Sequence, residues 1–429
     1  MLSDWSSRKQ IDAPQGSVSR ERASPWPPFQ DLAEGPKVSS SILDRCRAPG
    51  IPNPDQNDVN HRSNSRSISG KPPYPHQPEG LTQGMELLVD WQAFGAEVNT
   101  ASFERVKSRY EAAGFLYPDK RKRLEPYWAV IADSWDRTMS AGDSLRRLFS
   151  WQSSDGARWA FVDLWRATER SWWVQHLVAN GGGTGSLKTM LAATARSFAD
   201  PWMAGCEAWF RPVNRFANRM LGGGADALCH DGGKSTQLYL RVPYFDAGPV
   251  TGLHIREVKQ ASADLMRLAV QNRHPAFPSV AALADDPLLD AVDSRYRAVG
   301  LRRYRRIFTA TDRAGRLLGA VLAHRAPLGL NYSFLENRCD LLLDDEDPQD
   351  AEGTAQALVA AVADTYGDFA PGFIPVMLTS DTTAAESVRA ALHAELMQTY
   401  AQAVWLRAGL PRLAEYFYHA GRRTRRPQK

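Results

Sequence analysis

The residues best suited to chemistry in this chain form one short glycine-rich segment. It contains Asn180, Gly181, Gly182, Gly183, Thr184, Gly185 and Ser186. An apolar stretch, 174–179, precedes the glycines, and apolar residues with helical spacing follow as far as Leu191. Glycines permit a sharp turn and leave backbone N–H groups accessible, and we expect Ser186 to cap the helix. A strand, a glycine turn and a helix N-terminus together attract anions, so the segment predicts a phosphate-bearing ligand.

Two common phosphate-binding motifs fit this segment poorly. A nucleotide-hydrolase P-loop needs Lys directly after its last glycine, whereas Lys188 comes three residues after Gly185. A dinucleotide-binding unit needs an acidic residue at the end of the next strand. The strand expected at 206–210 has none there.

The segment is more similar to the acyl-CoA loop of the GNAT superfamily of N-acetyltransferases. In that family Gln/Arg-x-x-Gly-x-Gly/Ala leaves the fourth strand and a helix follows; here Asn180 stands in place of Gln or Arg. A second family pattern, Asn-x-x-Ala, matches Asn214 to Ala217. A hairpin predicted from strands at 145–151 and 158–165, with Asp155-Gly156 in its turn, also fits. The resemblance covers residues 145–244.

The resemblance implies an acyl-CoA-dependent N-acyltransferase. Its co-substrate would be acetyl-CoA or another acyl-CoA, and its acceptor an amine on a small molecule or peptide. The residues expected to bind the co-substrate are the backbone N–H of Leu177 or Val178 for the thioester carbonyl, the segment from Asn180 to Ser186, and Asn214.

Acyl transfer to an amine also needs a base and often an acid for the departing thiolate. By resemblance, Glu169 falls where histone-type members of the family keep a catalytic glutamate. His176 is the second candidate, because the pKa of histidine suits proton transfer near neutral pH. Glu169 also fits a polar turn, and His176 a packed strand. Leu221 occupies the position of the tyrosine that serves as acid in many members, and Tyr239 is a candidate substitute.

The order of predicted elements divides the chain into four parts. Residues 1–82 are rich in Ser, Pro, Arg, Asn and Gln, and we expect them to be disordered. Residues 83–246 form the acyl-CoA-binding domain, and 251–420 repeat its order of strands and helices. The fold class is α/β (α+β), with a mixed, mostly antiparallel sheet flanked by helices in each domain. Residues 421–429 are a basic tail.

The second domain lacks the glycine loop and carries an acidic run at 344–350 instead. Its charges would repel the phosphates of CoA. The run lacks the central Gly and terminal Glu of an EF-hand, so we expect a solvated loop and no metal site. The second domain is therefore predicted to be a degenerate copy that packs or shapes a substrate cleft.

Composition narrows the class of protein further. The net charge of +4 is small and does not indicate nucleic-acid binding. The four cysteines are scattered without metal-ligand spacing, which fits a reducing compartment. The sequence has no apolar run of membrane-spanning length and no signal-peptide core, so we expect a cytoplasmic protein. It does not indicate an oligomeric state.

Two functions remain open at this point. The intact glycine loop favours an active N-acyltransferase, because a binding loop tends to erode once its ligand is lost. The leucine at position 221 favours a catalytically inactive tandem fold that senses acyl-CoA or binds a protein partner as a regulator.

Overall fold

The computed structural model describes most of one unit of the chain, Ile68–Lys429. The described residues are 82–181, 183–245, 252–259, 262–273, 292–344, 348–369, 371–380 and 384–423. The extension expected to be disordered lies outside them apart from Thr82, as do residues 345–347 of the acidic run and 424–429 of the basic tail.

The first half of the fold runs from α1 to β6. Its leading elements are α1 (Thr82–Val89), β1 (Glu97–Val98), α2 (Phe103–Ala112), α3 (Pro118–Leu124) and α4 (Trp128–Ser140). A hairpin, the glycine turn and a helix follow as β2 (Arg146–Gln152), β3 (Trp159–Arg166), β4 (Ser171–Asn180), α5 (Gly183–Phe198) and β5 (Gly205–Phe210). The half closes with α6 (Arg215–Ala217), a π-helical turn (Asn218–Gly222), α7 (Gly223–Asp226) and β6 (Gly232–Val242).

The second half has a similar order of elements. It starts with β7 (His254–Val258), α8 (Ala263–Arg273), α10 (Asp293–Ala298), β8 (Tyr304–Thr311) and β9 (Leu317–Arg325). It continues with β10 (Cys339–Leu343), α11 (Pro348–Ala361), β11 (Ile374–Thr379), α12 (Ala385–Ala391), β12 (Glu395–Leu406) and α13 (Leu410–Arg423).

The twelve strands of the described residues join one mixed sheet in the order β1-β2-β3-β4-β5-β12-β6-β11-β10-β9-β8-β7. The contacts β4–β5 and β10–β11 are parallel, and the other neighbours are antiparallel. The expected mixed, mostly antiparallel sheet flanked by helices is therefore confirmed.

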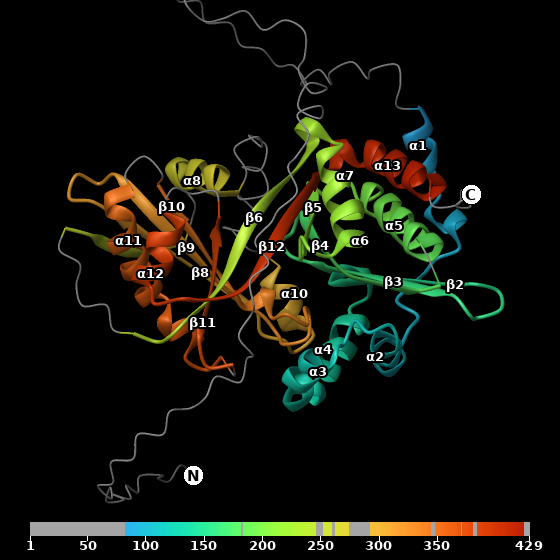
Figure 1. The fold of residues 1–429 in the computed structure, drawn as a ribbon, viewed down its shortest axis with the longest axis horizontal. Coiled ribbons are helices and arrows are strands. Elements are labelled where there is room, and N and C mark those ends of the chain that lie inside the picture. Colours follow the sequence, from blue (N-terminus) through green and yellow to red (C-terminus); the bar gives the residue numbers. More distant parts are fainter. Residues whose placement is uncertain are drawn as a thin grey trace, which may run out of the picture. The chain divides into compact units, whose positions relative to one another are not determined.

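The two halves exchange their last strands. β12, from the end of the second half, pairs with β5, whereas β6, from the end of the first half, pairs with β11. β6 and β12 also pair with each other in the middle of the sheet (Figure 1). The halves thus share one continuous sheet, and neither completes its strand order alone.

Helices cover both faces of the first half. α1, α5 and α13 lie together over one face, where Trp172 and Leu191 belong to one buried cluster with Phe417 (Figure 1). α2, α3 and α4 lie over the other face, and their core includes Tyr110 and Trp135. The same core cluster also includes buried residues of α11 and α12, which cover the sheet in the second half.

Two elements differ from the sequence expectation. The sequence predicts a helix at 383–396, but the helix there is limited to α12, and β12 begins at Glu395. α13 extends to Arg423, into the segment expected to be a loose tail. The basic run from Lys120 to Arg123 lies within the helix α3, as is typical of such a run. Among the described residues, no helix has the length and apolar character needed to cross a membrane.

Candidate acyl-transfer site

A β-bulge interrupts β4 at His176 and Leu177. Phe161 of β3 pairs with Val178 and Asp163 pairs with Gln175, so one residue of β3 faces two of β4. His176 takes a left-handed conformation, with φ of 49°. Such a conformation costs a non-glycine residue roughly 1–3 kcal/mol and persists only where its surroundings enforce it.

Neighbouring groups hold His176 in this conformation. Its Nε2 accepts the backbone N–H of Tyr332 at 3.3 Å, and its backbone carbonyl accepts the hydroxyl of Tyr110 at 3.4 Å. The ring of Tyr332 lies over the imidazole, with 4.5 Å between centroids. Nδ1 lies 3.6 Å from a carboxylate oxygen of Asp163, which is long for a hydrogen bond but favourable as an electrostatic contact.

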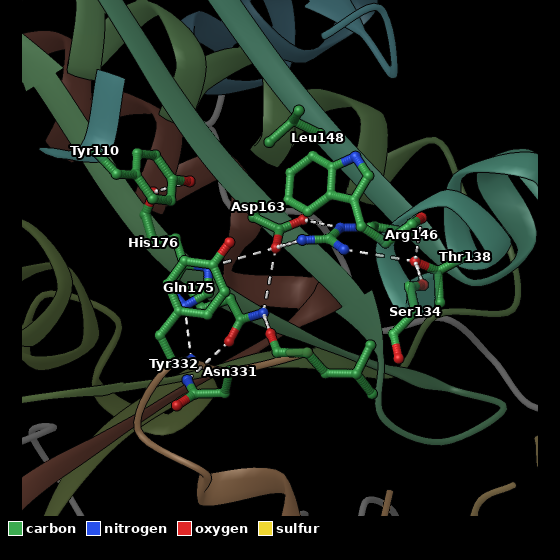
Figure 2. Close-up of polar contacts among 12 residues, drawn as sticks. Tyr110, Ser134, Thr138, Arg146, Leu148, Asp163, Gln175, His176, Asn331 and Tyr332 are labelled. Carbon is green, nitrogen blue, oxygen red and sulfur yellow. Dashed lines mark hydrogen bonds and ion pairs between the residues drawn. The ribbon is translucent and has the colours of Figure 1, made fainter. Parts of the chain in front are cut away.

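A buried polar network fixes the strand next to the bulge (Figure 2). Arg146 of β2 donates to both carboxylate oxygens of Asp163, at 2.9 and 2.6 Å. Gln175 of β4 donates to Asp163 at 3.3 Å and to the carbonyl of Leu330. The side-chain carbonyl of Gln175 accepts from Asn331 at 2.8 Å. The network therefore ties three strands of the first half, β2, β3 and β4, to the segment between β9 and β10.

The charge states within this network follow from burial and pairing. Burial opposes the charge of Asp163, but Arg146 and His176 together outweigh this effect and lower the pKa of the carboxyl. Burial lowers the pKa of His176 to about 4, although Asp163 acts in the opposite direction. His176 is therefore neutral at pH 7. Because its Nε2 accepts a hydrogen bond, the ring proton is assigned to Nδ1.

β4 and β5 part just before the bulge. They pair only from Ser171 with Gly205 to Val174 with Ala208. Both strands lie entirely within the described residues, and β4 continues to Asn180 without further pairing to β5. The corresponding strand of the second half, β10, ends at Leu343, two residues after its last pair with β11. A long parting of parallel strands is thus a feature of the first half.

The glycine turn lies at the end of the parted strand. Gly181 has φ of 70°, and Gly182 lies outside the described residues. α5 begins at Gly183, where an added Cβ would meet no atom within 4 Å. At Gly185 the same atom would lie 2.8 Å from the ring of Trp151. Gly183 thus borders open space, whereas Gly185 allows the helix to pack on β2.

The remaining residues expected to bind the co-substrate have varied roles. Thr184 and Ser186 lie in the first turn of α5, and Ser186 is buried within the helix. Ser186 therefore does not cap α5, because the glycines before it are themselves helical. Asn180 uses its side chain to accept the N–H of Trp159 at 2.7 Å and to donate to Ala157 at 3.0 Å. It stabilises the β3–β4 hairpin.

Three further positions complete this set. Leu177 is half-buried and Val178 is buried, both at or beside the bulge. Asn214 caps α6, with its side chain accepting the N–H of Ala217 at 3.2 Å. The short helix expected after this asparagine is therefore present.

Glu169 lies away from the bulge. It stands before the first residue of β4, seven positions ahead of His176, or roughly 20 Å along an extended chain. Arg295 of α10 binds both of its carboxylate oxygens, at 3.0 and 2.7 Å. The structure does not bring Glu169 and His176 together, and Glu169 instead links the first half to the second.

Leu221, at the position of the missing tyrosine, and Tyr239, the candidate for the thiolate acid, are both buried. Leu221 packs in the core beside α5. Tyr239 of β6 is 3% exposed, and its hydroxyl has no hydrogen-bond partner among the residues that the structure describes. Its ring lies 6.1 Å from that of Tyr400 in β12, at the strand pair that the halves share.

Sequence reasoning missed the residues that enforce the bulge. A single acid, Asp163, inside an apolar strand was the available signal, because a buried charge requires a partner. The contribution of Tyr332 had no local signal, since it comes from a distant segment. Within the described part of the chain, no group of three or more His, Cys, Asp or Glu residues is placed to hold a metal ion.

Comparison with solved structures gives several similar chains. A tandem GNAT protein from the clavulanic acid biosynthesis pathway is 14% identical, with 73% of this chain and 98% of that chain covered and a TM-score of 0.38. A GCN5-related N-acetyltransferase from Sphaerobacter thermophilus is 11% identical, with 64% and 85% covered and a TM-score of 0.34. A GNAT-family acetyltransferase from Colwellia psychrerythraea is 12% identical, with 67% and 96% covered and a TM-score of 0.30.

Comparison of the sequence with protein-family models and with curated proteins gave no match.

Proposed function

We propose that this chain transfers an acyl group from acyl-CoA to an amine, at the parted strands of its first half. The observation that carries the proposal is the combination of a bulged β4, its parting from β5 and the start of α5 at its end. Beyond Val174, β4 remains paired with β3, but its backbone groups on the side of β5 have no strand partner among the described residues. Such groups need other hydrogen-bond partners, which an extended amide-bearing ligand can supply.

Each part of acyl-CoA has a proposed position. The pantetheine amides lie along β4 beyond Val174, in the manner of an added strand. The thioester carbonyl accepts a backbone N–H of Leu177 or Val178 at the bulge. The pyrophosphate lies at the first turn of α5, beside Gly183, where unpaired N–H groups and the helix dipole favour negative charge.

The reaction requires little from side chains once the thioester is polarised. The nitrogen of the neutral amine bonds to the carbonyl carbon, the C–S bond breaks, and the proton that the nitrogen loses passes, directly or through water, to the thiolate of CoA. His176 is a weak base here, because burial lowers its pKa to about 4 and its Nε2 accepts from Tyr332. Its proposed role is to hold the bulge that presents the backbone N–H group.

The acceptor approaches from the face of α2 and α3. α5 covers the opposite face, where Met190 and Leu191 pack against Trp172. The acceptor face carries His176 and the aromatic rings of Tyr110 and Tyr332 around it. A small-molecule or peptide amine is the proposed acceptor, and acetyl the proposed acyl group.

A regulator that binds acyl-CoA without turnover is the second candidate. It is favoured by Leu221 at the expected position of the acid and by the engagement of Glu169 with Arg295. Both candidates need the same binding site, and they differ only in whether CoA is released.

The test is calorimetric titration of the full chain with acetyl-CoA and longer acyl-CoAs, followed by assay of thiol release with a panel of amines. Gly183→Ala and Gly183→Glu form a matched pair, because the position borders open space. We expect binding to survive in the first variant and to be lost in the second by charge repulsion. A folded wild-type protein that binds no acyl-CoA rejects both candidates. Binding without amine-dependent thiol release favours the regulator.

A further inference from the structure

Lys120 has a buried amino group with no acidic partner in the part of the chain that the structure describes. Its side chain, in α3, is 7% exposed. Among the described residues no carboxylate lies within ion-pair distance of it, although a buried lysine is normally paired. Its Nζ instead lies 3.9 Å from the ring centroid of Phe115, an attraction that leaves the charge uncompensated.

The charges around Lys120 are positive. Arg123, on the same helix, and Arg211, directly after β5, both disfavour its charged form. Burial is the largest cause, and the three effects lower the pKa of Lys120 to about 7. His176 of β4 is affected in turn, since the charge of Lys120 lowers the pKa of the imidazole. Burial raises the pKa of Tyr400 in β12, although Arg123 and Arg211 act in the opposite direction.

The basic cluster formed by Lys120 and its neighbours lies beside the bulge, on the face of the sheet from which the acceptor approaches. Phe115 contacts both His176 and Lys120. Its ring centroid lies 5.5 Å from that of His176, and the Lys120 ammonium lies over the same ring. Phe115 packs on the core formed with α2 and α4, whereas α5 lies on the other face of the sheet. A ligand group that reaches Lys120 is therefore close to the reacting carbonyl and separate from phosphates at the start of α5.

We propose that Lys120, with Arg123 and Arg211, binds a carboxylate carried by one of the two substrates. The inference rests on the proposed function and narrows its substrate class. The carboxylate belongs either to the acyl group, as in a dicarboxylic acyl-CoA, or to the amine acceptor, as in an amino acid. In both cases it supplies the counter-charge that the buried ammonium lacks.

Proton uptake provides a direct test. At pH 8 the free Lys120 amine is largely neutral, and a bound carboxylate favours its charged form, so binding takes up about one proton. Titration calorimetry of the full chain in phosphate and in Tris buffer measures this number. For a carboxylate on the acyl group, succinyl-CoA is compared with acetyl-CoA, which lacks it. For a carboxylate on the acceptor, L-glutamate and L-alanine are compared with L-alaninamide in the presence of CoA.

Two lysines of one helix give the matched variants. Lys120→Met should abolish the uptake and weaken carboxylate binding at least tenfold, whereas Lys122→Met, at an exposed position of α3, should change neither. Uptake with succinyl-CoA alone assigns the carboxylate to the acyl group. Uptake with the amino acids but not the amide assigns it to the acceptor.

Three results would overturn the inference. The first is proton uptake that is equal for acetyl-CoA and succinyl-CoA, which would assign the bound anion to the phosphates of CoA. The second is the absence of proton uptake with every carboxylate probe. The third is proton uptake in Lys120→Met that equals that of the wild type. If acetyl-CoA still binds in any of these cases, the inference about Lys120 fails but the proposed acyl transfer does not. A structural role for Lys120 would instead lower the midpoint of thermal unfolding in Lys120→Met without affecting ligands.

Discussion

Asn331, between β9 and β10, donates its side-chain N–H to the side-chain carbonyl of Gln175 in β4, at 2.8 Å and out of contact with solvent. Gln175 directly precedes the bulge, and the next residue after Asn331, Tyr332, donates to His176. The second half of the chain thus supplies the contacts that set the backbone of the candidate site in the first half.

This contact predicts measurable coupling between the two positions. Gln175→Ala and Asn331→Ala should each lower the free energy of unfolding by about 1–3 kcal/mol, because each leaves a buried polar partner unsatisfied. The double variant should lose less than the sum, with a coupling energy of about 0.5–3 kcal/mol in urea denaturation. Strict additivity would show that the hydrogen bond contributes nothing.

The buried pair of Arg146 and Asp163 predicts a larger effect. Asp163→Asn leaves the guanidinium buried without a counter-charge, and we expect a loss of about 3–5 kcal/mol in unfolding free energy. The double change Arg146→Met with Asp163→Leu removes both charges and should cost less than the single change. Equilibrium denaturation of the three proteins checks the ranking, and the reverse order would contradict it.

Two buried histidines predict how stability depends on pH. Burial lowers the pKa of His176 to about 4 and of His324 to about 3, below the unfolded value of about 6.5. The unfolded chain therefore binds protons first as the pH falls. The contribution of each histidine is complete above pH 6.5 and is lost towards pH 4, by up to about 3 kcal/mol.

The variant His324→Gln tests this pH effect. Its unfolding free energy, measured between pH 7.5 and 5, should fall less steeply than that of the wild type, because the histidine no longer titrates and the carboxyl groups other than Asp340, which lies 3.0 Å from the His324 ring, contribute equally to both proteins. Parallel curves would show that His324 titrates normally in the folded state.

The glycine turn predicts opposite effects at neighbouring positions. Gly185→Ala places a methyl group 2.8 Å from the Trp151 ring and should destabilise the fold by about 1–3 kcal/mol. Gly183→Ala meets no atom within 4 Å and should be neutral or stabilising by up to about 1 kcal/mol, because alanine favours helix. Thermal unfolding of the two variants measures both effects, and equal melting temperatures would refute the difference in packing.

Local patterns predicted much of the first half. The hairpin around Asp155-Gly156 and the strand–turn–helix around Gly183 are both present, because turn residues and apolar periodicity act over short distances. The start of α5 differed from the expectation, since glycines can join a helix and no pattern distinguishes that case. α13 was missed although Leu410, Leu413 and Phe417 have helical spacing and are buried.

Non-local pairing explains what the sequence could not predict. The segment containing Tyr332 reaches the bulge through the tertiary fold, and no periodicity connects it to His176. The burial of Lys120 within a basic run was equally hidden, because its neighbours in sequence are exposed. The expected catalytic role of Glu169 was based on its position in the sequence. Sequence position alone cannot show that this carboxylate forms an ion pair with Arg295, which is distant in the chain.

The exchange of β6 and β12 has a consequence for biosynthesis. β5 leaves the ribosome long before β12, the strand that covers its edge. Until β12 has been synthesised, the nascent first half therefore exposes an unpaired strand edge beside apolar residues, a condition that promotes aggregation. We expect the sheet of the first half to be completed only after β12 has left the ribosome, and a chain shortened before β12 to become a substrate for chaperones and proteases.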